Sequence, residues 1–224
     1  EANFKAFVDQ IQQFQPDFAI DLGDFGCQVA SGQTTWEMHD GQLDGLKHHV
    51  QVFGQLKCPR YHVMGNHDVG WLKGGDEEIT PDDLIGRGHS GEDITKQEFL
   101  DVTGMRHRYY SFDIQGFHFI VLDGNNGPEA TVSVRGRDGI VGAYWIDSKQ
   151  KQWLAADLAK SRQKPKIVFC HEELHHTPAG GSGQGGDTPF APVGKQHSYI
   201  DNGWEVRKLF ADDGHVLACF FGHK

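Results

Sequence analysis

Apolar positions along the chain alternate between helical and strand spacing. Apolar residues recur every third or fourth position within 4–14, 43–56, 148–162 and 202–213, which predicts four amphipathic helices, and a shorter helix is expected around ITKQEFLDVTG. Short apolar runs between them predict strands: DFAIDLGD, YHVM, RYYSFDI, FHFIVLDG, KIVFC and HVLACFF. Strands alternating with helices indicate an α/β protein with a substantial sheet. Because no linker or repeat interrupts the pattern, we expect a single domain over residues 1–224.

Composition narrows the kinds of partner. The chain has 224 residues, of which 38% are hydrophobic, so it is long enough to bury a core. Its formal charge of −10 argues against a nucleic-acid-binding surface, which needs a basic face. No apolar run approaches the roughly 18 residues of a membrane-spanning helix, so no span is expected. The sequence indicates no oligomeric state. It opens inside a helical pattern and stops just after an apolar strand, so we expect a fragment truncated at both ends.

Four short polar signatures follow predicted strands: LGD (22–24), GNHD (65–68), CHEE (170–173) and GHK (222–224). In α/β folds ligands collect at the carboxyl ends of strands, so these signatures are expected at one edge of a sheet. Together they offer carboxylate, amide and imidazole groups, which are ligands that divalent ions such as Zn, Mn and Fe accept. Each signature alone is weak, and their convergence predicts a metal site.

The order of these signatures resembles the calcineurin-like metallophosphoesterase family, whose pattern contains G-D, G-N-H-D/E, an isolated His after a strand and G-H-x-H. The matching positions are Gly23-Asp24, Gly65-Asn66-His67-Asp68, His171 and Gly222-His223. The resemblance implies a four-layer sandwich of two mixed β-sheets flanked by helices. The family's D-x-H block and the last His of G-H-x-H are absent here, and these would supply most of the first metal's ligands.

The resemblance further implies metal-dependent hydrolysis of a phosphomonoester or phosphodiester by a dinuclear centre with a bridging hydroxide. The two ions would be Mn, Fe or Zn, and the partner a small-molecule phosphoester. By position, Asp24 would bridge the ions, and the second ion would be bound by Asn66, His171 and His223.

The GNHD block also carries the expected catalytic groups, which are Asn66, His67 and Asp68. His67 would donate a hydrogen bond or a proton to the phosphoryl group, and Asp68 would orient His67. His175 and Asn125 are weaker candidates for substrate contact. Selectivity would come from the polar stretch 70–93 and the Gly-rich loop 180–186. Such Gly-rich insertions are common in exported members, which favours a periplasmic or secreted location slightly over a cytoplasmic one.

Two alternatives compete with this interpretation. His171-Glu172-Glu173-Leu174-His175 matches the H-E-x-x-H signature of zinc proteases. That chemistry needs both histidines on one helix, whereas the apolar strand IVFC precedes His171 and Thr177-Pro178 closes any helix after it, so the match is attributed to chance. The second alternative is a degenerate phosphoesterase fold that only binds ligands, against which the chain keeps both the GNHD histidine and Asp24.

Overall fold

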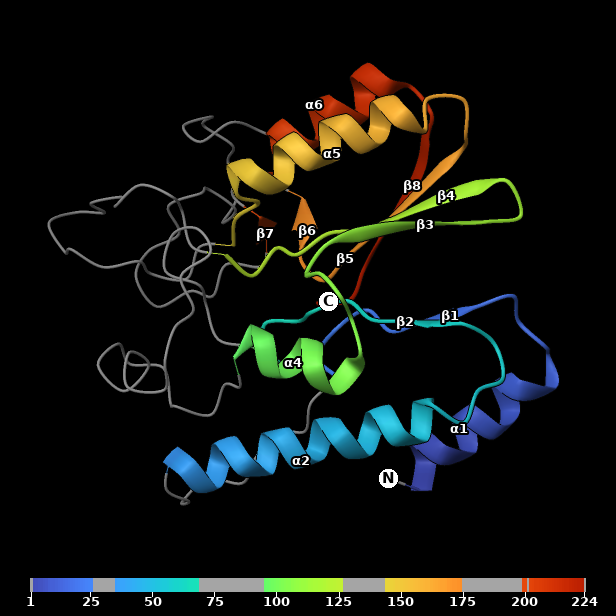
Figure 1. Ribbon diagram of the computed structural model, residues 1–224, viewed down its shortest axis with the longest axis vertical. Coiled ribbons are helices and arrows are strands. Elements are labelled where there is room, and N and C mark those ends of the chain that lie inside the picture. Colours follow the sequence, from blue (N-terminus) through green and yellow to red (C-terminus); the bar gives the residue numbers. More distant parts are fainter. Residues whose placement is uncertain are drawn as a thin grey trace, which may run out of the picture. The chain divides into compact units, whose positions relative to one another are not determined.

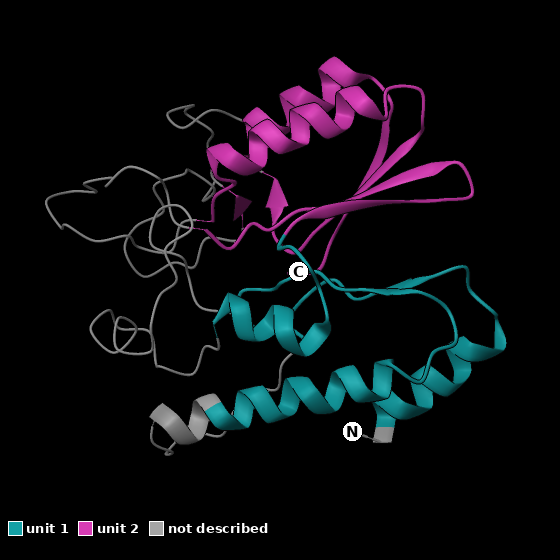
Figure 2. Ribbon diagram, viewed as in Figure 1, with its two compact units in different colours: residues 1–70, 79–108 teal, residues 71–78, 109–224 magenta. Residues whose placement is uncertain are grey.

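The computed structural model describes residues 2–25, 35–68, 95–126, 144–174, 199–200 and 202–223. The chain divides into two compact units (Figure 2). Unit 1 comprises residues 1–70 and 79–108, and unit 2 comprises residues 71–78 and 109–224. In the part of the chain that is described, no helix is both long and apolar enough to cross a membrane.

Unit 1 combines helices with a short parallel strand pair. Its described elements are α1 (Ala2–Gln13), β1 (Ala19–Ile20), α2 (Thr35–Phe53), β2 (Arg60–Tyr61) and α4 (Lys96–Thr103) (Figure 1). The strands predicted from DFAIDLGD and YHVM are therefore shorter than expected. β1 and β2 pair with each other over two residues each, and the chain then leaves the ladder to form the LGD and GNHD turns.

Local sequence signals explain the ends of α4. The Thr95 side chain accepts a hydrogen bond from the Glu98 N–H, and the Glu98 carboxylate accepts one from the Thr95 N–H, which is a complete capping box. Gly104 ends the helix in the left-handed region at φ +72°. The helix buries Phe99 in a cluster with Leu46 of α2, which anchors it to the rest of unit 1.

Unit 2 is built on a four-stranded mixed sheet in the order β3-β4-β5-β8. Its elements are β3 (Tyr110–Ile114), β4 (Phe117–Val121), α5 (Ser148–Lys160), β5 (Lys166–Cys170), β6 (Glu173–Leu174), β7 (Tyr199–Ile200), α6 (Gly203–Asp213) and β8 (Val216–Phe221) (Figure 1). β3 and β4 are antiparallel, whereas β4, β5 and β8 are parallel neighbours. The predicted α/β class with a mixed sheet is confirmed. The short parallel pair of β6 and β7 was not predicted, because two-residue strands leave no periodic signal.

The β3–β4 hairpin turns at Gln115 and Gly116, between the two strands predicted from RYYSFDI and FHFIVLDG. Gln115 and Gly116 have φ values of +49° and +85°. Two consecutive positive φ values match the right-handed twist of the strands, and Gly116 adopts its value without steric cost.

The two faces of the unit 2 sheet differ. Helices α5 and α6 both cover one face (Figure 1) and bury a core with the sheet; Ile120, Val168, Leu154, Leu158, Val206 and Phe210 are among its residues. The other face carries a row of phenylalanines, one from each strand: Phe112, Phe119, Phe169 and Phe220. Neighbouring rings stack with centroids 5.1–6.2 Å apart, so period-two alternation along each strand fills both faces with apolar side chains.

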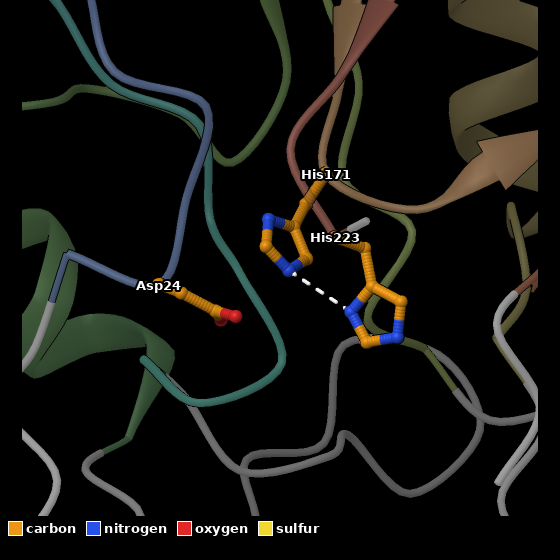
Figure 3. A group of neighbouring side chains, drawn as sticks. All are labelled: Asp24, His171 and His223. Atoms are coloured by element: carbon orange, nitrogen blue, oxygen red, sulfur yellow. Dashed lines mark hydrogen bonds between the residues drawn. The ribbon is translucent and has the colours of Figure 1, made fainter.

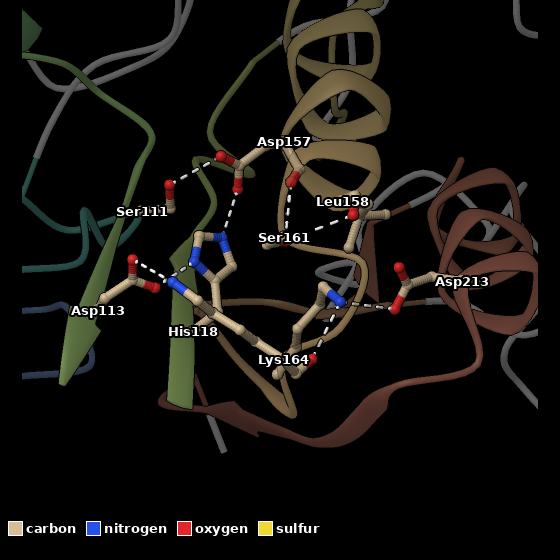
Figure 4. A network of polar contacts seen from close by, with 9 residues as sticks. Ser111, Asp113, His118, Asp157, Leu158, Ser161, Lys164 and Asp213 are labelled. Atoms are coloured by element: carbon tan, nitrogen blue, oxygen red, sulfur yellow. Dashed lines mark hydrogen bonds and ion pairs between the residues drawn. The ribbon is translucent and has the colours of Figure 1, made fainter. Parts of the chain in front are cut away.

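A polar network lies where β4 and β5 begin, at the opposite end of these strands from the predicted site (Figure 4). Both ring nitrogens of the buried His118 lie 2.8 Å from carboxylate oxygens, one of Asp113 and one of Asp157. Lys166, fully buried beside His118 in the sheet, pairs with Asp213 of α6 at 3.1 Å. These contacts tie the strands to both helices, so the framework of unit 2 is held by charge as well as by its apolar core.

Candidate metal centre

The LGD turn of unit 1 holds Asp24 in an unusual backbone conformation. Gly23 and Asp24 both have positive φ, +92° and +57°. Asp is one of the few residues besides Gly that adopt the left-handed region with little cost. The turn is stabilised by Asp21, whose Oδ1 accepts the Gly23 N–H at 3.1 Å while its Oδ2 contacts Nδ1 of the buried His62. Asp21 and His62 therefore have structural roles, and Asp24 is presented at the surface of the unit.

The GNHD turn is closed by its own aspartate. The Asp68 carboxylate, 1% exposed, accepts the Gly65 N–H at 2.9 Å, and the Asp68 N–H donates to the Gly65 carbonyl at 3.1 Å. From α2, the buried Gln42 side-chain amide donates to the His67 carbonyl. Nothing in the sequence pattern singled out Gln42, since its partner lies 25 positions away. The main chain around His67 is thus fixed from two sides.

A hydrogen bond and a close backbone contact join the LGD and GNHD turns within unit 1. The His67 N–H donates to Asp24 Oδ1 at 2.9 Å. A Cβ atom at position 65 would lie 2.2 Å from Asp24 N and 2.3 Å from Asp24 Oδ1, so only glycine fits there. The structure therefore brings the predicted residues Asp24, His67 and Asp68 together. Asn66 between them is half-buried, and the His67 side chain is exposed.

In unit 2, His171 and His223 are brought together by two neighbouring parallel strands. β5 and β8 end in register, with Cys170 opposite Phe221. Just beyond, the His171 carbonyl accepts the N–H groups of both Gly222 and His223 at 3.0 Å. His223 Nδ1 then lies 3.2 Å from His171 Nε2 (Figure 3). His171 is 1% exposed and His223 half-buried, so both rings are held in place by the ends of the sheet.

The spacing of these nitrogens fits a shared metal ion. Two imidazole nitrogens about 2.0–2.1 Å from one ion lie about 2.8–3.4 Å apart when the angle between them is between octahedral and tetrahedral. The observed 3.2 Å between His171 Nε2 and His223 Nδ1 falls in this range. Imidazole nitrogen is also a suitable donor for Zn and Fe. The pair can therefore hold a metal ion without rearrangement.

Two cysteines lie on the strands that lead to this pair, Cys170 on β5 and Cys219 on β8. Burial raises the pKa of the Cys170 thiol well above its ordinary value, and the nearby carboxylates of Glu172 and Asp123 raise it further. Burial likewise raises the pKa of Cys219 to about 11. Because the thiolate is the form that binds metals and attacks electrophiles, both residues stay inert thiols at neutral pH.

The H-E-x-x-H match lacks the geometry of a zinc protease. Residues 171–174 contain no helix: they form a bend followed by the strand β6. Glu172 is 0% exposed, so its carboxylate does not face solvent. The rejection of the protease interpretation is therefore supported. His175 lies outside the described residues.

Asn125, the second candidate for substrate contact, lies in a buried loop after β4. Its side chain is 0% exposed, its N–H donates to Asp123 Oδ1 at 3.0 Å, and it forms a bridge with Trp145. Tyr144, the neighbour of Trp145, packs against the ring of His223 at a centroid distance of 5.8 Å. The sequence did not predict that contact, because Tyr144 belongs to no motif.

The comparisons with known proteins agree with this geometry. The family model described as calcineurin-like phosphoesterase matches residues 1–224, so the chain belongs to that family. Among the curated proteins compared with the chain, none matches. The resemblance drawn from the sequence is confirmed, and with it the α/β sandwich class. Metal-dependent phosphoester hydrolysis is the general activity of this family.

Proposed function

We propose that the chain hydrolyses a small-molecule phosphoester using metal ions bound by Asp24, Asn66, His171 and His223. The observation that carries the proposal is the pair of imidazole nitrogens, 3.2 Å apart at the ends of adjacent strands. Family membership over residues 1–224 supports the assignment of Asp24 and Asn66 from unit 1 to the same centre.

The proposed centre is dinuclear, with Mn, Fe or Zn as its ions. When bound, the ions would supply Lewis acidity to the phosphoryl oxygens and would activate a water as the nucleophile by lowering its pKa. Asp24 suits the bridging position, because its carboxylate has two oxygens and its direction is fixed by the left-handed turn and by the His67 N–H. Asn66 contributes a neutral amide oxygen, which leaves an ion more electrophilic than a carboxylate would.

His67 is proposed as the group that stabilises the phosphoryl charge and protonates the leaving oxygen. Its main chain is held on both sides, by Asp24 at the N–H and by Gln42 at the carbonyl, while its side chain is exposed. An exposed imidazole on a fixed main chain can meet substrate without a costly rearrangement. Asp68 acts as a positioning residue by closing the turn that carries His67. Substrate contact by His175 or Asn125 and location outside the cytoplasm both stay predictions.

The test is metal analysis combined with a panel of phosphoester substrates. The chain, loaded separately with Mn²⁺, Fe²⁺ and Zn²⁺, is assayed on p-nitrophenyl phosphate and bis-p-nitrophenyl phosphate. We expect bound metal and metal-dependent turnover, and we expect His171→Ala to lose both, with metal affinity falling by more than the roughly 10- to 100-fold typical of outer-shell changes. His215→Ala is the matched control, because that exposed histidine lies just before β8, eight positions from His223.

The outcomes separate the proposal from a binding scaffold. Bound metal that depends on His171, without turnover of either substrate, identifies a degenerate fold that only binds ligands. Metal binding that survives His171→Ala contradicts the proposed centre itself.

A further inference from the structure

The imidazole of His223 is flanked by two aromatic rings. One is His171, with ring centroids 5.2 Å apart and planes inclined by 77°. The other is Tyr144, with centroids 5.8 Å apart and planes inclined by 66°, an edge-to-face arrangement. Such pairs favour a defined relative orientation of the two rings beyond the area that they bury.

Tyr144 is itself rigidly supported. Its ring is 7% exposed and belongs to the main apolar cluster of unit 2, and its backbone bridges to Ile200 of β7. Ile146, two positions after Tyr144, is held by the side chain of Asn202. Asn202 Oδ1 accepts the Ile146 N–H at 2.9 Å, and Asn202 Nδ2 donates to the Ile146 carbonyl at 2.7 Å.

Trp145, the residue after Tyr144, is also held by hydrogen bonds. The Trp145 N–H donates to the Gly124 carbonyl at 2.9 Å, and the Asn126 side-chain amide donates to the Trp145 carbonyl at 3.3 Å. An irregular segment held at three consecutive residues by buried partners has little freedom to move. The Tyr144 ring is therefore held rigidly where it contacts His223, which is itself only half-buried.

We propose that Tyr144 is a positioning residue, whose ring fixes the plane of the His223 imidazole so that Nδ1 faces the same point as His171 Nε2. Ligating histidines are normally oriented by hydrogen-bond partners outside the metal's own shell, and loss of such a partner weakens metal binding by roughly 10- to 100-fold. The Tyr144 ring would orient His223 by packing instead, so we expect an effect at the lower end of that range. The inference rests on the proposed function of His171 and His223 as metal ligands.

The experiment measures metal affinity of the chain by titration calorimetry with Zn²⁺ and Mn²⁺. We expect Tyr144→Leu, which keeps an apolar side chain but removes the ring, to weaken binding roughly tenfold. Tyr144→Phe keeps the ring and should bind within about twofold of the parent. The matched control is Tyr109→Leu, because Tyr109 makes a comparable ring contact in unit 2, with Trp153 at 4.9 Å. Its loss should lower stability without changing metal affinity.

A second readout uses Co²⁺, whose visible absorption reports ligand geometry. The bands of Tyr144→Leu should shift, whereas those of Tyr144→Phe and Tyr109→Leu should match the parent. If the parent binds metal, His223→Ala weakens binding and Tyr144→Leu equals the parent, the positioning role is wrong and the proposed function stands. If His223→Ala binds as well as the parent, the proposed function itself fails.

Discussion

The main-chain N–H of His67 donates to the Asp24 carboxylate at 2.9 Å, so the tie between the GNHD and LGD turns uses no side-chain atom of His67. This separation has an experimental advantage. Any substitution at position 67 other than proline keeps the N–H that orients Asp24. The imidazole can therefore be removed without removing the hydrogen bond that holds the proposed bridging ligand.

His67→Ala should slow hydrolysis of alkyl phosphoesters much more than hydrolysis of aryl phosphoesters. An alkoxide is a poor leaving group and needs a proton, and general acid catalysis typically contributes 10²–10⁴-fold, whereas a nitrophenolate departs without one. The measurement is kcat/KM for a matched pair of alkyl and nitrophenyl esters. Metal content should stay unchanged, because the hydrogen bond to Asp24 is kept. An equal loss on both esters would argue against the acid role.

Gly65→Ala should abolish metal binding at the Asp24 side of the centre. Its Cβ would lie 2.2 Å from Asp24 N, so the LGD turn must move away and the carboxylate with it. The measurement is metal stoichiometry and affinity, together with turnover of a phosphodiester.

The control for this variant is Gly116→Ala. A Cβ there meets nothing within 4 Å, but φ is +85°, so the substitution strains the hairpin and costs about 1–2 kcal/mol of unfolding free energy. It should lower stability yet leave metal affinity unchanged. If Gly65→Ala loses no more metal than Gly116→Ala, the close approach of the two turns is not what positions Asp24.

Most of the fold follows from local patterns, and most of the site does not. The helices and strands could be predicted because apolar spacing repeats within a few residues, and the short helix expected around ITKQEFLDVTG forms α4. The motif residues could be assigned because each follows a strand. By contrast, Gln42, Tyr144 and Asn202 support the site through contacts between residues 25 to 79 positions apart. Sequence periodicity carries no information about such pairs, so only the folded chain reveals them.

Asp113→Asn should make the free energy of unfolding depend less steeply on pH in the acid range. Hydrogen bonds hold the pKa of Asp113 below its ordinary value of 3.8. The larger effect comes from the Lys164 ammonium and the smaller from the buried His118 ring. A carboxylate with a folded pKa below its unfolded value adds stability above the unfolded pKa, and this stability is lost as pH falls through the folded pKa. The midpoint of urea unfolding should therefore fall from about pH 4 downward in the parent, and less steeply in Asp113→Asn.

Lys164→Gln provides the complementary test. Because Lys164 is the main cause of the lowered pKa, its removal should also flatten the curve, by less than Asp113→Asn, since His118 remains. The Asp113 side chain is 51% exposed, so added salt should weaken the effect in the parent. An unchanged slope in Asp113→Asn would show that the network of Figure 4 does not respond to acid through this carboxylate.

Two substitutions of Asp68 distinguish whether this residue acts by closing the turn or through its negative charge. Asp68→Ala leaves the buried Gly65 N–H without its acceptor, which costs about 1–3 kcal/mol of unfolding free energy and releases the turn that carries His67. Asp68→Asn keeps an oxygen acceptor of the same shape but removes the charge. If Asp68 acts by closing the turn, Asn should restore stability, metal content and the pH profile of kcat, whereas Ala should lose activity and stability together. If Asn restores stability but displaces the pH profile, the charge of Asp68 acts on the catalytic group and the turn-closing role alone is insufficient.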